Sequence, residues 1–137
     1  KAGVYVTHVN DVKTSFGKKY AILANTLNGF VRPSIAQMVE RAPEAAPCEP
    51  LYTGSSAFGF VPLTDETETE VVTVCGNLCT GADVIAQDTE LPKLKTGDVF
   101  VITNAGSYAA VLTPMQFASL TPPVQIFADP DGRLTVL

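Results

Sequence analysis

Short runs of β-branched and aromatic residues, each ended by a turn signal, constrain the fold of this chain more than any other feature. The run from Val4 to Val12 is rich in Val, Thr and Tyr, and the run from Lys19 to Leu23 has the same character. Such runs are typical of strands. Gly17 lies between them and suits the positive φ of a tight turn. The chain is therefore predicted to open with a β-hairpin.

A short helix is predicted next, from about Pro33 to Arg41. A proline suits the first turn of a helix because its missing N–H would have no partner there. Ile35 and Val39 then recur at helical spacing. The proline-rich stretch 43–50 is predicted to be a loop or an edge.

The rest of the chain predicts a mainly β fold. Further strands are expected at 70–75, 99–102, 124–127 and 134–136, and the acidic stretch 64–70 is expected to be a solvated loop. Together these elements indicate an antiparallel β-barrel or sandwich with one or two short helices. No repeat or linker divides the sequence, so residues 1–137 form one predicted domain.

Composition excludes several classes of protein. Apolar residues make up 46% of the chain and charged residues 17%, which is typical of a globular domain. The net charge of -5 argues against a nucleic-acid partner. No apolar run approaches the roughly 20 residues of a membrane-spanning helix. The chain begins at Lys1 without an initiator Met or a signal peptide, so we expect a fragment of a longer cytoplasmic protein.

The cysteines and the histidine predict no metal site. Cys48, Cys75 and Cys79 are an odd number, which does not favour a secreted disulfide framework. The spacing of Cys75 and Cys79 differs from the usual Cys-x-x-Cys pair, and His8 is the only histidine. We assign His8 to a strand surface without a functional role.

One stretch carries chemical information. Residues 75–88 read Cys-Gly-Asn-Leu-Cys-Thr-Gly-Ala-Asp-Val-Ile-Ala-Gln-Asp, and Leu-Pro, Gly-Asp and Gly-Ser-Tyr elements follow at 91–92, 97–98 and 106–108. This order resembles the C-terminal domain of the fold-type III pyridoxal-phosphate-dependent amino-acid decarboxylases, which include diaminopimelate, ornithine and arginine decarboxylases. Residues 27–33 and 122–125 resemble two further family elements, although the family usually has Glu at the position of Gln125.

The resemblance implies two catalytic residues and one that binds the cofactor. Pyridoxal phosphate acts as an electron sink for the reaction. Cys79 would protonate the substrate carbon that has lost CO2 or lie beside the group that does so, and a thiol with an ordinary pKa of about 8.5 is suitable for this transfer. Asp83 would face the substrate from the same loop, and Tyr108 would hydrogen-bond the cofactor phosphate. A structural thiol, a turn residue and a packing tyrosine are the alternative interpretations.

Three further residues are candidates for binding the substrate. Arg32 would bind a carboxylate, and Phe117 would line the pocket. A surface arginine and a core phenylalanine are equally good interpretations of these two. At the position of Thr80 the diaminopimelate decarboxylases have Glu and the ornithine decarboxylases have Asp. At the position of Ala36 the diaminopimelate decarboxylases have Tyr. We therefore expect a substrate other than diaminopimelate, whose identity the sequence leaves open.

The resemblance also implies partners outside this chain. In the family, the Schiff-base lysine and the phosphate-binding loop lie on an N-terminal (β/α)8 barrel. The six lysines here lie in turn-like or polar contexts, so the isolated chain is expected to be inactive. Family members form head-to-tail dimers in which the Cys loop works in the partner's active site. An excised domain would then expose an apolar face and self-associate.

Three other functions compete with this interpretation. A catalytically inactive regulatory homologue would bind a partner through the dimer face, but such a protein has no need for Cys79 and Asp83. An alanine-racemase-like domain shares the architecture but fits the Cys-x-x-x-Asp and Gly-Ser-Tyr elements less well. A free-standing barrel for a small ligand is the interpretation that remains if the Cys79 segment is disregarded.

Overall fold

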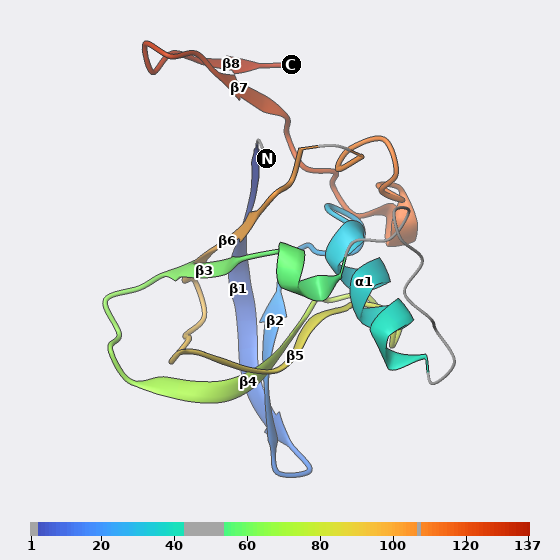
Figure 1. The fold of residues 1–137 in the computed structure, drawn as a ribbon, viewed down its shortest axis with the longest axis vertical. Coiled ribbons are helices and arrows are strands. Elements are labelled where there is room, and N and C mark those ends of the chain that lie inside the picture. Colours follow the sequence, from blue (N-terminus) through green and yellow to red (C-terminus); the bar gives the residue numbers. More distant parts are fainter. Residues whose placement is uncertain (1–2, 43–53, 107) are drawn as a thin grey trace.

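A curled six-stranded sheet is the main feature of the computed structural model, which describes residues 3–42, 54–106 and 108–137 (Figure 1). Its strands are β1 (Val4–Ser15), β2 (Lys18–Leu23), β3 (Phe60–Leu63), β4 (Thr69–Cys75), β5 (Val84–Pro92) and β6 (Val99–Thr103), in the order β3-β6-β1-β2-β4-β5. Neighbouring strands are antiparallel, except that β2 and β4 are parallel. The predicted mainly β fold is confirmed. The sheet curls into an open half-barrel.

The remaining elements are short. Helix α1 (Arg32–Arg41) begins one residue before the predicted start, and η1 (Ser55–Ala57) and η2 (Phe117–Ser119) are single 3-10 turns. Strands β7 (Ile126–Ala128) and β8 (Leu134–Val136) form a separate hairpin that extends away from the sheet (Figure 1). The proline-rich stretch and Cys48 lie outside the described residues. No described helix is long and apolar enough to cross a membrane.

The predicted opening hairpin is confirmed, and its turn explains its register. Phe16 and Gly17 have φ values of 48° and 76°, so both residues of the two-residue turn are left-handed. This is the geometry that matches the twist of two antiparallel strands. Along the first half of β1 the side chains then alternate, with Tyr5, Thr7 and Val9 buried.

Two strands were not predicted. Strand β3 has only four residues and includes Pro62, which has no N–H to donate to a ladder. Pro62 is tolerated because β3 lies at the edge of the sheet and, among the described residues, pairs with β6 alone. Strand β5 has a mostly polar second half, which hides the strand pattern.

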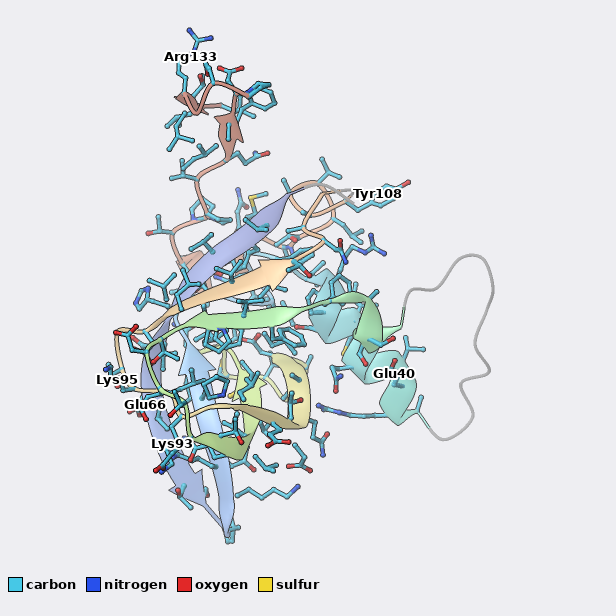
Figure 2. The ribbon with its side chains drawn as sticks, turned by 60° about the vertical axis from the view of Figure 1, so that its left-hand side comes forward. Glu40, Glu66, Lys93, Lys95, Tyr108 and Arg133 are labelled. Carbon is cyan, nitrogen blue, oxygen red and sulfur yellow. The ribbon has the colours of Figure 1, made fainter. Side chains whose placement is uncertain are left out.

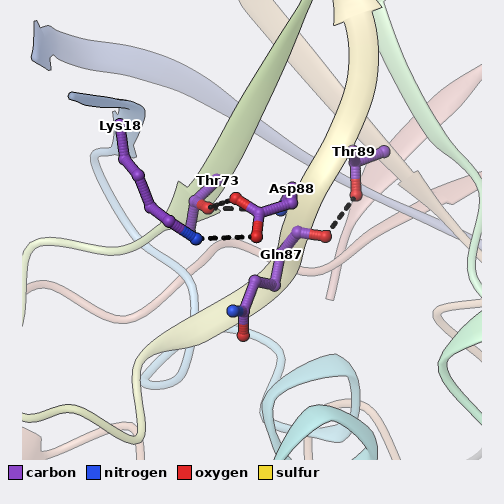
Figure 3. A network of polar contacts seen from close by, with 5 residues as sticks. All are labelled: Lys18, Thr73, Gln87, Asp88 and Thr89. Carbon is purple, nitrogen blue, oxygen red and sulfur yellow. Dashed lines mark hydrogen bonds and ion pairs between the residues drawn. The ribbon is translucent and has the colours of Figure 1, made fainter.

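Strand β5 is bent and held by a polar network (Figure 3). Asp88 has a φ of 47° where the ladder between β4 and β5 shifts register. Its N–H donates to the Thr73 hydroxyl at 3.2 Å, and the ammonium of Lys18 donates to its carboxylate at 2.8 Å. The bond from Lys18 lowers the pKa of Asp88 below its ordinary value. Because the ion pair is solvent-exposed, its main effect is to fix the bend rather than to add stability.

The core lies on the concave side of the sheet. Phe30, Phe100 and Ile102 are fully buried there, with Leu23 and Ile85. Phe30 packs edge-on against Phe58, with ring centroids 5.7 Å apart, an arrangement that aromatic pairs favour.

Truncating the core should be costly. Phe100→Ala is expected to lower the free energy of unfolding by about 3–5 kcal/mol, because it removes a buried ring and leaves a cavity. Urea unfolding followed by circular dichroism measures the change. Phe16→Ala is the matched control, since that ring is fully exposed in the turn. A similar loss of stability in both variants would contradict the burial of Phe100 in the core.

Candidate functional site

The loop of residues 76–83, which connects β4 to β5, presents Cys79 to solvent. The N–H of Gly76 donates to the carbonyl of Asp83 at 2.9 Å and closes the base of the loop. The N–H of Asp83 donates to the carbonyl of Thr80 at 3.2 Å. We call these residues the Cys79 loop. Its own backbone holds it in shape, so the exposed thiol has a defined position.

The carboxylate of Asp83 lies inside the protein, with only 1% of the residue exposed. It accepts hydrogen bonds from the hydroxyl of Thr26, from the N–H of Leu27 at 3.0 Å and from the N–H of Leu78 at 3.1 Å. We expected this carboxylate to face a substrate from the loop. In this structure it instead joins the Cys79 loop to the segment that precedes α1.

Gly76 is required by this arrangement. A Cβ at this position would overlap the Thr26 hydroxyl and the Asp83 carboxylate. The side-chain space of residue 76 is therefore occupied by the hydrogen bond between Thr26 and Asp83. Glycine alone leaves room for it.

Residues 25–31 form a hub segment to which several loops are tied. Besides the contacts of Asp83, the side chain of Asn25 donates to the carbonyl of Thr121 at 3.2 Å. The N–H of Val31 donates to the hydroxyl of Thr113 at 3.1 Å. Leu27 and Val31 also pack in a small apolar cluster with Leu78 of the Cys79 loop.

The other predicted site residues lie on the elements tied to this hub. Arg32 is half-buried and begins α1, directly after the hub segment. Tyr108 is 64% exposed with a φ of 59°, and its side chain points away from the sheet (Figure 2). Phe117 is 41% exposed in η2. The structure thus places Cys79, Thr80 and Asp83 in one loop, whereas Tyr108 and Phe117 are exposed on other segments.

Sequence reasoning did not identify Thr26 and Gly76. Gly76 gave a weak signal, because it stands three residues before Cys79. The sequence gave no signal for Thr26, since its partner Asp83 lies 57 residues further along the chain.

A hollow of about 560 Å³ lies between the Cys79 loop and the first hairpin. Its lining includes Lys13, Tyr20, Cys75, Asn77 and Thr80. Burial raises the pKa of the Cys75 thiol, the negative charge of Asp83 raises it further, and Lys13 lowers it. Cys75 therefore remains protonated at neutral pH. No group of three His, Cys, Asp or Glu side chains within the described ranges could hold a metal ion.

Substitution of Gly76 tests the role of the Asp83 hydrogen bonds. Gly76→Ala is expected to lower the free energy of unfolding by about 1–3 kcal/mol, because the new methyl group displaces a buried hydrogen bond. Chemical denaturation measures the loss. Gly81→Ala in the same loop is the control, since a Cβ there meets open space. Equal stabilities of the two variants would contradict the arrangement.

The two cysteines of this region should differ in reactivity. At pH 8, iodoacetamide is expected to alkylate Cys79 well before Cys75, because Cys79 is exposed and the pKa of Cys75 is raised. Raising the pH above 9 should accelerate the reaction at Cys75. Mass spectrometry of peptides after timed quenching gives both rates. Faster labelling of Cys75 would rule out the burial described here.

The chain is similar to parts of larger decarboxylases. It is 27% identical to an L-glutamyl-[BtrI acyl-carrier protein] decarboxylase of Niallia circulans over 129 residues, covering 92% of this chain and 27% of the relative. It is 29% identical to the diaminopimelate decarboxylase of Archaeoglobus fulgidus over 110 residues, covering 80% and 22%. The chain thus spans about a quarter of the length of these relatives.

A solved structure and a family model agree with these similarities. The diaminopimelate decarboxylase of M. jannaschii superposes with a TM-score of 0.73 at 22% identity, over 97% of this chain and 26% of that one, which shows the shared fold. Residues 1–106 match the family model described as "Pyridoxal-dependent decarboxylase, C-terminal sheet domain". With more than half of its length matched, this chain belongs to the family of C-terminal sheet domains of pyridoxal-dependent decarboxylases.

Proposed function

We propose that this chain is one part of a shared active site in an amino-acid decarboxylase that uses pyridoxal phosphate. The N-terminal barrel of the same protein would supply the cofactor lysine, and the Cys79 loop would reach the active site of the second subunit in a homodimer. The observation that carries the proposal is the exposed Cys79 on a loop fixed by buried hydrogen bonds. A positioned proton donor requires this combination.

Cys79 would act as the proton donor. When bound, the cofactor supplies an electron sink for the charge that departing CO2 leaves behind. The thiol of Cys79 would transfer its proton to the substrate carbon, and the resulting thiolate would regain a proton from solvent. Exposure of Cys79 supports both steps, since the thiol is open to a substrate and to water.

Asp83 would act through Cys79 rather than on the substrate. The carboxylate is 1% exposed and accepts three hydrogen bonds within the domain. Its bond from the N–H of Leu78 fixes the residue directly before Cys79. We therefore assign it the role of a positioning residue, in place of the substrate contact that the family resemblance suggested.

The residues of this domain are suited to make part of the contacts that bind the cofactor. The Tyr108 hydroxyl is an exposed donor, and a phenol hydrogen-bonds readily to a phosphate oxygen. A phosphate dianion is ordinarily bound by several backbone N–H groups or cations. Tyr108 would therefore supply one contact, and the barrel would supply the others.

The substrate we propose has no ammonium group at its far end. Thr80 is half-buried beside the hollow, and its hydroxyl accepts a hydrogen bond from the N–H of Ala82 at 3.2 Å. A hydroxyl cannot pair with an ammonium as a carboxylate does. The two relatives described above are named for different substrates, so the sheet domain serves more than one. Arg32 would bind a carboxylate, and Phe117 would contact the substrate tail.

Release of CO2 by the full-length protein tests this function. The protein, loaded with pyridoxal phosphate, is assayed on a panel of basic, acidic and carrier-linked amino acids. We expect activity on one substrate and a fall in kcat of about 100-fold or more in Cys79→Ala, since general acid catalysis contributes about that much.

Cys75→Ala is the matched control, because it removes a thiol four residues away that is partly buried. It should retain nearly all of the activity, and the isolated 137-residue chain should have none. If the loaded full-length protein releases no CO2 from any substrate, the lyase proposal fails and a regulatory homologue takes its place.

A further inference from the structure

The floor of the hollow beside the Cys79 loop is the outer face of β1, β2 and β4. In one row across these strands Asp11 pairs with Ile22, and Ile22 pairs with Cys75. In the next row Lys13 pairs with Tyr20. Side chains two residues apart on a strand point to the same side, so these five share one face. The residues that alternate with them fill the core on the other side of the sheet.

The Cys79 loop forms the second wall of the hollow, through Asn77, Leu78 and Thr80 among others. The volume of about 560 Å³ lies within the range of about 300–1,000 Å³ that is usual for small-molecule pockets. Thr80 lines the hollow, and Cys79 directly before it is exposed. A molecule that meets the Cys79 thiol at one end can therefore extend into the hollow at the other.

The polar groups of the hollow that remain available are donors. In the described part of the chain, the ammonium of Lys13 and the hydroxyl of Tyr20 take part in no hydrogen bond or ion pair. The Thr80 hydroxyl accepts the N–H of Ala82, which leaves its own proton to donate. These three side chains offer several donors and one positive charge to an occupant.

The two carboxylates of the hollow are already engaged. Asp83 accepts three hydrogen bonds inside the domain. Asp11 is exposed at the rim, and one of its oxygens accepts the N–H of Val12 at 2.9 Å. The groups left for an occupant thus suit an acceptor with a single negative charge, and a carboxylate is the common group of this kind.

We propose that Lys13 determines the substrate class by binding a carboxylate at the far end of the substrate, within this hollow. The inference rests on the proposed function, because it takes Cys79 as the group that meets the reacting carbon. Ile22 and Val84 also line the hollow and would pack against the aliphatic part of the substrate. Arg32 is not among the lining residues, so a carboxylate that it binds is a different one.

Alkylation of Cys75 in the full-length protein tests this preference without any turnover. Iodoacetate carries a carboxylate, and iodoacetamide is its neutral counterpart. With either reagent the Cys75 thiolate attacks the methylene carbon and iodide leaves, so the ratio of the two rates does not depend on the thiolate fraction. Both rates are measured at pH 9 by peptide mass spectrometry.

Lys13→Gln should lower the ratio of the iodoacetate rate to the iodoacetamide rate at Cys75 by about threefold or more, because a nearby positive charge is lost. Lys95→Gln is the matched control, since Lys95 is exposed and lies outside the hollow. An unchanged ratio in Lys13→Gln would overturn the proposal. So would a Cys75 that neither reagent labels in the native protein, because another part of the protein would then fill the hollow.

Steady-state kinetics of the loaded full-length protein test the substrate class directly. An amino acid with a carboxylate at its far end is compared with the same compound as an amide. Lys13→Gln should raise KM for the acid about tenfold, the usual contribution of a hydrogen bond to a charged group, and leave kcat and the KM for the amide nearly unchanged.

The two levels of the proposal fail in different ways. If the protein releases CO2 from substrates with neutral or basic tails and Lys13→Gln changes no KM, the assignment of Lys13 is wrong and the proposed function stands. If no substrate releases CO2, the proposed function falls and the substrate assignment falls with it, whatever the alkylation ratio.

Discussion

The buried carboxylate of Asp83 is the interaction on which the rest of the candidate site depends. Burying a carboxylate is costly unless hydrogen bonds replace those it makes with water. Three donors do so here, one from the Cys79 loop and two from the hub segment. Because the donors come from both sides, neither the loop nor the hub can move without breaking a buried bond. The site is therefore rigid where it meets the sheet.

The same charge affects its neighbours. Tyr5 has a raised pKa, mainly because it is buried and partly because of Asp83, and so remains a neutral phenol. Its hydroxyl donates to the carbonyl of Asn25 at 3.2 Å, at the start of the hub segment. A neutral Tyr5 keeps its proton for this bond at all ordinary pH values. The hub is thus held to β1 as well as to the loops.

The local parts of the fold could be predicted from the sequence. Gly17 and Pro33 act through φ and the missing N–H, which depend on the residue itself. The edge strand β3 could not be predicted, since Pro62 is acceptable there only because no described strand pairs with the outer side of β3. The site shows the same division. The roles of Cys79 and Tyr108 stay predictions from their motif, whereas the inward orientation of Asp83 depends on Thr26, a partner far away in the sequence.

The hydrogen bonds of the Cys79 loop bear on how such a domain could evolve. The carbonyl of residue 80 accepts the N–H of Asp83, a bond that any side chain at position 80 permits. Exchange of this side chain would remove the bond from the N–H of Ala82 to the Thr80 hydroxyl but would leave the backbone bonds of the loop in place. Gly76 has no such freedom, since its side-chain space is already filled. Under the proposed function, a lineage would acquire new substrates at position 80 and preserve the proton donor at position 79.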